Sequence, residues 1–269
     1  MKNIPCDMHT HSVFSHDGGK DSGIDALCMR AIELGLSYLA ITDHCDVNGE
    51  AEKIYASYDS DGAWQAMCAA KEKYRGSLNL ILGIELGQPE QYPEVAEAFL
   101  RRHPYEFIIG SVHNLDKVPD FCMMNFEYIP DALASQLFDR TLDEMNALID
   151  FPITTLAHLT YQTRYMAMAG KRFDFAPHRD KTAALLKKLI SRGIALEVNV
   201  STVWRGLGFT MPQAEIIALY RDLGGSLITI GSDAHSPVNL GRGINEGLEL
   251  IRSLGFDRVI TTKGNFILI

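Results

Sequence analysis

Long hydrophobic runs are missing from this sequence. The longest apolar stretches, such as residues 78–86, fall far short of the roughly 20 residues that a membrane-spanning helix needs. The opening residues, MKNIPCD, also lack the apolar core of a secretory signal peptide. We therefore expect a cytoplasmic protein with no membrane partner.

Basic residues are also in short supply. The 269 residues include 25 Lys and Arg against 34 Asp and Glu, a formal net charge of −9, and no basic run occurs. Nucleic-acid binding depends on Lys and Arg contacts with phosphates, so nucleic acid is not an expected partner. Hydrophobic residues make up 46% of the chain, which is enough for a globular core and excludes a largely disordered protein.

Cysteine is scarce and widely spaced. The cysteines are Cys6, Cys28, Cys45, Cys68 and Cys122, and no two of them form a Cys-x-x-Cys pair. Their odd number and their spacing indicate neither a disulfide framework nor a zinc ribbon. Reduced thiols in the cytoplasm are the simplest interpretation. Although Cys45 adjoins His44, we expect it to be a small buried apolar residue rather than a metal ligand.

Short apolar or β-branched runs alternate with amphipathic stretches along the chain. Apolar residues at 3.6-residue spacing predict helices at 24–34, 63–74, 92–102, 131–148, 179–191, 213–223 and 244–253. The apolar runs predict strands at 6–9, 38–42, 78–85, 107–112, 153–157, 195–198, 226–230 and 265–269. This alternation is typical of a parallel α/β barrel or a doubly wound sheet.

No linker or internal repeat divides the pattern, so residues 1–269 are expected to form a single domain. Three long stretches, 43–62, 113–129 and 159–177, are expected to be loops. Long loops in a compact domain usually carry function.

Six of the nine histidines fall at, or just past, the carboxyl ends of predicted strands. They are His9, His11, His44, His113, His158 and His235, and Asp43, Glu85, Asn199 and Asp233 hold equivalent positions. The carboxyl ends of a parallel barrel meet on one face, where such enzymes have their active sites. Imidazoles and carboxylates gathered there would leave charge uncompensated unless cations bound. The pattern therefore predicts a metal cluster, whereas His103 and His178 are expected at the surface.

The string His9-Thr10-His11 sharpens this prediction, because alternate residues of a strand point to one side and can bind a single metal. Further strings are Thr42-Asp43-His44, Gly83-x-Glu85, Gly110-Ser-Val-His113, Ala157-His158 and Gly231-Ser-Asp-Ala-His235. Together they resemble the PHP (polymerase and histidinol phosphatase) family of metal-dependent phosphoesterases, and within it the monofunctional histidinol-phosphate phosphatases. The resemblance extends from His9 to His235, nearly the whole chain.

This resemblance implies a distorted, TIM-like (β/α)7 barrel with three metal ions at the carboxyl face of its strands. It implies a first metal held by His9, His11, Glu85 and Asp233, a second held by Glu85, His113 and His158, and a third held by Asp17, His44 and His235. Asp17 is favoured over the adjacent His16, because the Ser-x-x-Ser-x-Asp-Gly spacing fits. Glu85, Asp233 and His235 are also expected to be essential for catalysis.

Metal ions suit the hydrolysis of a phosphate monoester. The ester is a dianion, and hydroxide attacks it very slowly unless its charge is neutralised. Divalent ions neutralise the phosphate oxygens, and a water that bridges two of them becomes a hydroxide near neutral pH. Mixed imidazole and carboxylate ligands favour zinc, iron or manganese. The resemblance implies L-histidinol phosphate, from histidine biosynthesis, as the small-molecule substrate.

Arginine is the expected phosphate-binding residue, because its guanidinium fork matches phosphate oxygens. Arg164 and Arg205 each lie in a loop just past a predicted strand, and Tyr161 shares the first of these loops. We expect both arginines to bind the phosphate and Tyr161 to wall the rest of the substrate. The alternative for the arginines is ordinary exposure to solvent. For Tyr161 the alternative is packing in the core or in a lid.

Three other functions stay open on the sequence alone. A PHP phosphoesterase for a nucleotide or a phosphotyrosine would have the same metal ligands. An amidohydrolase-type barrel also begins with His-x-His, but its bridging ligand is often a modified lysine after the fourth strand, where this chain has His113. A metal-binding module without catalysis is disfavoured by the complete ligand set. The sequence assigns neither the general acid, for which Asp43 is one candidate, nor the oligomeric state.

Overall fold

The computed structural model describes residues 5–54 and 57–269. Its centre is a parallel sheet in the order β1-β2-β4-β5-β6-β7-β8. The strands are β1 (Cys6–Asp7), β2 (Tyr38–Ile41), β4 (Asn79–Gly87), β5 (Phe107–Ser111), β6 (Thr155–Leu156), β7 (Ala195–Asn199) and β8 (Ile228–Gly231). A further strand, β3 (His44–Asp46), pairs with the second half of β4 and continues the position of β2.

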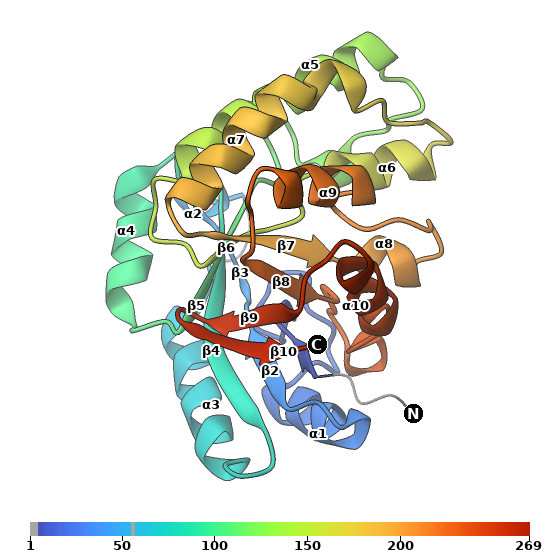
Figure 1. Cartoon of the computed structure of the whole chain (residues 1–269). Helices are drawn as coiled ribbons and strands as arrows, with labels where there is room; N and C mark the ends of the chain where they lie inside the picture. Colours follow the sequence, from blue (N-terminus) through green and yellow to red (C-terminus); the bar gives the residue numbers. More distant parts are fainter. Residues whose placement is uncertain (1–4, 55–56) are drawn as a thin grey trace.

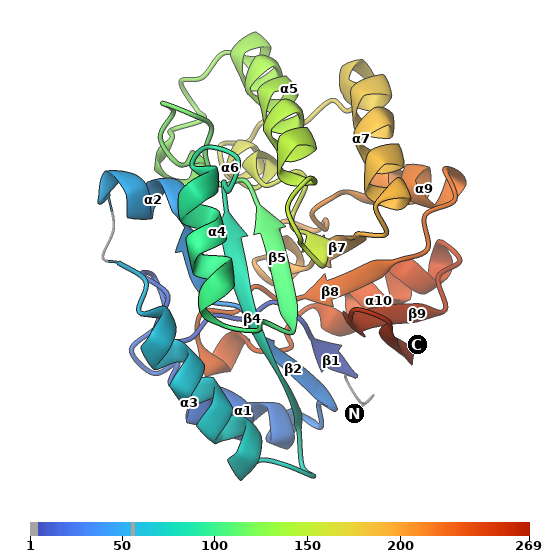
Figure 2. The same ribbon diagram turned by 90° about the vertical axis from the view of Figure 1, so that its left-hand side faces the viewer.

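The sheet curls until its two ends meet. The backbone N–H of Met8 donates to the carbonyl of Ile230 at 3.0 Å, and Thr10 and Ala234 form an isolated parallel bridge. The predicted TIM-like (β/α)7 barrel is therefore confirmed. All strands of this sheet run in one direction, so their carboxyl ends lie at one mouth of the barrel (Figure 2).

Seven longer helices cover the outside of the barrel, and α5 and α7 lie side by side in both views (Figures 1 and 2). The helices are α1 (Ile24–Leu34), α3 (Ser60–Lys73), α4 (Pro93–Arg102), α5 (Asp131–Leu148), α7 (Arg179–Ser191), α9 (Ala214–Asp222) and α10 (Ile244–Ser253). Each agrees with a predicted helix to within about three residues, the usual error at helix ends. Among the described residues, no helix combines the length and apolar character needed to cross a bilayer.

Several short elements are absent from the sequence-based predictions. The helices α2 (Val47–Glu52), α6 (Gln162–Met168) and α8 (Ser201–Trp204) are too short to show a clear helical period. Strand β3 and helix α2 lie in the expected loop 43–62, of which residues 55–56 are outside the described chain, and α6 lies in the expected loop 159–177. These two loop predictions were wrong in part. The stretch 113–129 contains only the single 3-10 turn η1 (Phe121–Met123).

The last predicted strand lies outside the barrel. It is β10 (Asn265–Leu268), which forms an antiparallel hairpin with β9 (Arg258–Thr262). Two other 3-10 turns, η2 (Ala176–His178) and η3 (Pro237–Asn239), precede α7 and α10.

A close contact with His9 explains why the Gly-Ser-Asp-Ala-His string begins with a glycine, Gly231. It ends β8 where this strand meets the chain after β1, and a Cβ on Gly231 would lie 2.2 Å from the Cβ of His9. Only glycine allows so close an approach. This contact brings the segment after β8 directly beside His9 and His11.

Candidate metal centre

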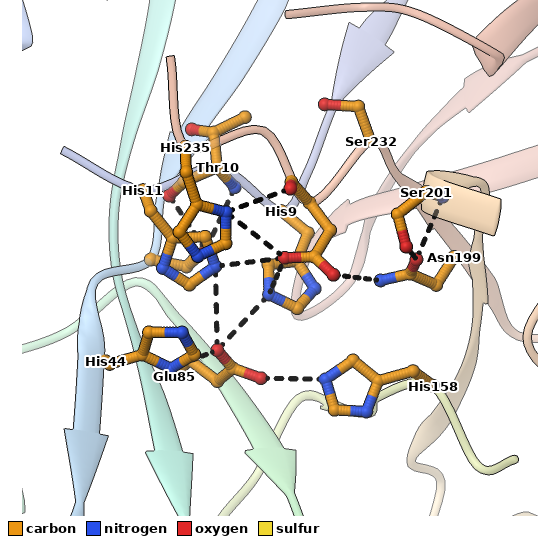
Figure 3. Close-up of polar contacts among 12 residues, drawn as sticks. His9, Thr10, His11, His44, Glu85, His158, Asn199, Ser201, Ser232 and His235 are labelled. Atoms are coloured by element: carbon orange, nitrogen blue, oxygen red, sulfur yellow. Dashed lines mark hydrogen bonds and ion pairs between the residues drawn. The ribbon is translucent and has the colours of Figure 1, made fainter. Parts of the chain in front are cut away.

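All nine predicted metal ligands meet at the carboxyl ends of the strands, and Figure 3 shows most of them around Glu85. His9 and His11 follow β1, His44 begins β3, Glu85 lies in β4, His113 and His158 follow β5 and β6, Asp233 and His235 follow β8, and Asp17 lies in the loop before α1. Six of the nine are buried: His9, His11, Glu85, His113, His158 and Asp233. The register of the sheet contributes directly, because His44 pairs with Glu85 across β3 and β4.

Glu85 is the central carboxylate of the cluster. Its Oε2 lies 2.8 Å from Nδ1 of His44 and 3.3 Å from Nε2 of His9. Its Oε1 lies 3.0 Å from Nε2 of His158 and 3.2 Å from Nε2 of His113. Burial raises the pKa of Glu85, but the nearby His9, His44 and His113 outweigh it and hold this pKa well below its ordinary value. Oε2 also lies 3.6 Å from Nε2 of His11, so each oxygen faces two or three imidazoles, as a carboxylate shared between two cations would.

Asp233 lies on the other side of His9 and His11. Its Oδ1 is 3.4 Å from Nε2 of His11, 3.9 Å from Nε2 of His9 and 3.7 Å from Nδ1 of His235. Its Oδ2 accepts a hydrogen bond from Nη2 of Arg164 at 3.0 Å. Asp233 has a φ of 56°, a left-handed conformation that Asp tolerates better than most residues. This turn directly after β8 sets the Asp233 carboxylate in the mouth of the barrel.

A third group of side chains lies toward solvent. Oδ2 of Asp17 is 3.1 Å from Nε2 of His235, and its Oδ1 is 3.7 Å from Nε2 of His44. The ring of His11 stacks on those of His235 and His44, with centroids 4.0 and 4.2 Å apart. The adjacent His16 has its Nδ1 3.9 Å from Oδ2 of Asp46. The carboxylate of Asp17 therefore faces the two histidines with which the resemblance grouped it.

The donor atoms of the cluster fit bound cations. Four sets of three have ligand atoms within 4.8 Å of one another: His9, His11 and Asp233; His9, Glu85 and His158; His44, Glu85 and His113; and His11, His44 and His235. Five buried atoms in these sets approach one another but form no hydrogen bond: Nε2 of His9, His11 and His235, Nδ1 of His44 and Oε2 of Glu85. Buried polar atoms without hydrogen bonds are costly. Zinc, iron or manganese would suit this mixed imidazole and carboxylate set.

Two further buried carboxylates contact predicted ligand histidines on the side away from Glu85, and neither carboxylate is among the predicted site residues. Oε1 of Glu197 lies 2.6 Å from Nδ1 of His9, and its Oε2 accepts from the backbone N–H of His158 at 2.8 Å. Oδ1 of Asp46 lies 2.9 Å from Nδ1 of His113. Such pairs orient the other ring nitrogen toward a metal. The signal for Glu197 is a lone carboxylate inside an otherwise apolar predicted strand.

Asp43 supports the loop after His11. Its carboxylate accepts hydrogen bonds from the N–H and Oγ of Ser12, at 2.5 and 2.8 Å, and from Oγ of Ser15 at 2.9 Å. Oγ of Ser15 also lies 3.1 Å from Nδ1 of His11. The serines of the His-x-His-Ser-x-x-Ser string therefore link Asp43 to a predicted ligand.

We expect Glu197→Gln to weaken zinc binding by about 10- to 100-fold, the usual effect of losing a carboxylate behind a metal-bound histidine. The amide fills the same volume but gives His9 a weaker hydrogen-bond acceptor. Competition with a chromogenic chelator would measure the zinc affinity of the metal-stripped protein. Glu215→Gln, on the exposed face of α9, is the matched control and should not change it. Equal affinity in wild type and Glu197→Gln would contradict this function of Glu197.

A cavity of about 520 Å³ opens beside the cluster. All three predicted substrate residues line it, together with several of the histidines. Arg164 is buried, donates from Nη2 to Asp233 and to Oγ of Ser201 at 3.1 Å, and has no partner for its Nε. Arg205 is exposed, with its Cζ 4.4 Å from the centroid of the Trp204 ring. Burial and the charge of Arg164 lower the pKa of Arg205, because the two guanidiniums are close.

Tyr161 is buried between the arginine and the histidines. Its ring centroid lies 5.0 Å from that of His158 and 5.1 Å from that of His113. Cζ of Arg164 is 5.1 Å from the same centroid, and the Tyr161 hydroxyl accepts from that of Tyr165 at 2.7 Å. The structure thus brings Tyr161 and Arg164 together beside the histidine cluster.

A larger groove of about 1110 Å³ lies at the opposite end of the barrel, between the loops that precede β6, β7 and β8. None of the predicted ligands lines it. The larger cavity therefore has no share in the chemistry of the histidine cluster.

The surface prediction for His178 was wrong. His178 is buried, with Nδ1 2.8 Å from Oδ1 of Asp139 and Nε2 3.1 Å from Oγ of Ser135. Both partners lie on α5, so the ring joins α5 to the start of α7. His103 is partly buried and stacks on Trp64, with ring centroids 5.0 Å apart. Neither histidine belongs to the cluster.

Comparisons with known proteins agree with this geometry. A probable histidinol-phosphatase of Thermotoga maritima is 31% identical over 252 residues, 93% of each chain. The histidinol-phosphatase of Lactococcus lactis is 24% identical over 265 residues, 96% of this chain and 94% of the relative. The crystal structure of a Lactococcus lactis histidinol phosphate phosphatase, complexed with zinc, L-histidinol and phosphate, has the same fold, with a TM-score of 0.78 at 22% identity and 94% coverage of both chains. A family model described as the PHP domain matches residues 7–201, and this chain therefore belongs to the PHP domain family.

Proposed function

We propose that this protein is a metal-dependent phosphomonoesterase that hydrolyses L-histidinol phosphate to L-histidinol and inorganic phosphate, in histidine biosynthesis. The main support is that one cavity joins a buried cluster of metal-ligating side chains to the guanidinium groups of Arg164 and Arg205. The names of the relatives, and the zinc, L-histidinol and phosphate in the Lactococcus lactis structure, support the same substrate for this chain.

The predicted ligand sets carry over into this proposal. His9, His11, Glu85 and Asp233 would hold one ion, Glu85, His113 and His158 a second, and Asp17, His44 and His235 a third. When bound, zinc, iron or manganese would neutralise phosphate oxygens and activate a water for attack on phosphorus. Glu85, Asp233 and His235 would be essential because they belong to these sets.

The remaining tasks belong to protein side chains. Arg164 and Arg205 would bind phosphate oxygens through charge-assisted hydrogen bonds, and Tyr161 would wall the alcohol part of the substrate. The hydrogen bonds of Arg164 to Asp233 and Ser201 fix its guanidinium in one position beside the cluster. Such fixed donors stabilise developing charge without reorganising during the reaction.

Phosphate release from L-histidinol phosphate tests the proposal. The same protein, supplied with zinc, manganese or iron, is assayed with a nucleoside monophosphate, a phosphotyrosine peptide and an aryl phosphate. We expect kcat/KM for L-histidinol phosphate to exceed the others by orders of magnitude. Equal values for all substrates would leave a metal-dependent phosphatase but overturn the named substrate.

Zinc binding should release protons at pH 7. Burial lowers the pKa of His44, but Glu85 outweighs it and raises this pKa to about 9 in the metal-free protein. His44 is then protonated at pH 7 and has to lose its proton to bind a metal. We expect at least one proton to be released and zinc affinity to fall as the pH is lowered. Calorimetric titrations in two buffers of different ionisation enthalpy measure this release, and identical heats in both would contradict it.

A further inference from the structure

We propose that Asp120 determines substrate specificity by binding a protonated amine on the alcohol part of the substrate. This inference deepens the proposed function and rests on it, because it concerns the same cavity. In this assignment Asp120 recognises the amine of the alcohol part, whereas the arginines bind the phosphate.

Asp120 lies in the long segment between β5 and α5 and lines the cavity of the metal centre. Its Oδ1 accepts a hydrogen bond from the backbone N–H of Cys122 at 2.7 Å and so caps the turn η1. This bond fixes the carboxylate, whose other side-chain contact is with the neutral thiol of Cys122. Asp120 is only partly exposed, so its position is determined by the structure rather than by solvent.

Asp120 differs from the other carboxylates of the cavity. Asp17 lies near His235, Asp46 near His113 and Asp233 near His11, each within 3.4 Å. For Asp120, no ion pair with Lys, Arg or His is found between the described parts of the chain. A carboxylate in a partly enclosed cavity is costly to desolvate unless a cation binds it. The natural partner of Asp120 is therefore a cation that the ligand brings.

The surroundings of Asp120 define the rest of the ligand. Burial raises the pKa of Tyr161 well above its ordinary value, and the negative charge of Asp120 raises this pKa further. Tyr165, Met123 and Met168 line the same cavity. Aromatic rings and thioethers favour a flat ring, and tyrosine faces also attract cations. A phosphate ester of an amino alcohol that carries a ring matches this combination.

An ammonium group is a better partner for Asp120 than an imidazole ring is. A primary amine has a pKa near 10 and is charged at neutral pH, whereas imidazole, with a pKa of about 6.5, is mostly neutral there. A hydrogen bond between a carboxylate and an ammonium is charge-assisted at both ends. Recognition of the ammonium is thus constant across the pH range in which the enzyme would act.

Asp120→Asn tests the proposal, because the amide oxygen can still cap η1 while the charge is lost. Two substrate pairs differ only in the amine: L-histidinol phosphate and 3-(imidazol-4-yl)propyl phosphate, and L-phenylalaninol phosphate and 3-phenylpropyl phosphate. The ratio of kcat/KM within each pair measures recognition of the amine. Asp116→Asn is the matched control, since Asp116 lies in the same segment, is exposed and pairs with Lys117 outside the cavity.

We expect Asp120→Asn to lower the amine-to-deamino ratio by about 10- to 100-fold, the usual loss for a hydrogen bond between charged groups. Turnover of the two deamino esters should stay within about twofold, as for a neutral surface change. Asp116→Asn should leave every ratio unchanged.

Three results would overturn the inference: a wild-type protein indifferent to the amine in both pairs, an unchanged ratio in Asp120→Asn, or an equal loss on all four esters. The last result would show that Asp120 only supports the fold of its loop. A wild-type protein that prefers neither imidazole ester over its phenyl counterpart would overturn L-histidinol phosphate as the substrate. The phenyl pair would still test Asp120 in that case, so the two failures are distinguishable.

Discussion

Glu85→Gln should reduce phosphate ester hydrolysis by about 10²- to 10³-fold or more, because metal ions supply several kcal/mol of charge stabilisation in such reactions. One oxygen of Glu85 faces three imidazoles of the cluster and the other faces two. A neutral amide of the same size cannot be shared between two cations. The bound metal should therefore fall together with kcat, and elemental analysis of the purified protein measures it directly.

A control variant is needed to show whether Glu85→Gln loses only its metal ions or also its fold. Glu127→Gln removes a carboxylate from an exposed position in the segment after β5 and should keep both metal and activity. Thermal unfolding of both variants shows whether the barrel is intact. His113→Ala should behave like Glu85→Gln, since Nε2 of His113 faces Oε1 of Glu85. Full activity in either variant would refute the cluster as the catalytic centre.

Arg164→Ala should weaken phosphate binding by about 2–4 kcal/mol, the cost of losing a desolvated charge-assisted pair. This corresponds to about a 30- to 1,000-fold rise in the inhibition constant of inorganic phosphate. Arg164 is buried beside the Tyr161 ring and is held by Asp233 and Ser201. Its Nε has no hydrogen-bond partner, and Arg164 lines the same cavity as Arg205.

Because Arg164 also contacts Asp233, metal content has to be measured in the same variant. We expect Arg164→Ala to retain its zinc, since Asp233 keeps its histidine neighbours. Arg205→Ala should also weaken phosphate binding, but less, because this side chain is exposed. Arg192→Ala is the control, since Arg192 lines the groove at the opposite end of the barrel. An unchanged phosphate inhibition constant in Arg164→Ala would exclude this arginine from the phosphate site.

The sequence predicts the barrel and the position of the cluster well, for physical reasons. Each long helix shows its apolar period over several turns, and α1 also ends as predicted, with Gly35 in the left-handed conformation at φ 73°. Strings such as His9-Thr10-His11 lie directly at strand ends, so the parallel topology alone brings them to one mouth.

The sequence is less informative wherever position depends on closure of the barrel. Glu197 is marked in the sequence only as a lone carboxylate in an apolar strand, and closure of the barrel, with β7 between β6 and β8, brings it to His9 and His158. Asp46 becomes a partner of His113 because β3 resumes pairing with β4 after a break. His178 was placed wrongly because its partners come from a different helix, α5.

The most direct test of the account is phosphate release from an aryl phosphate by the metal-stripped protein, before and after zinc is added back. We predict no release above background without metal and recovery of activity as zinc is restored. Glu85→Gln should not recover in the same titration. Equal activity before and after stripping, or no activity in the zinc-loaded protein, would contradict the central claim that this cluster is a metal centre for phosphate ester hydrolysis.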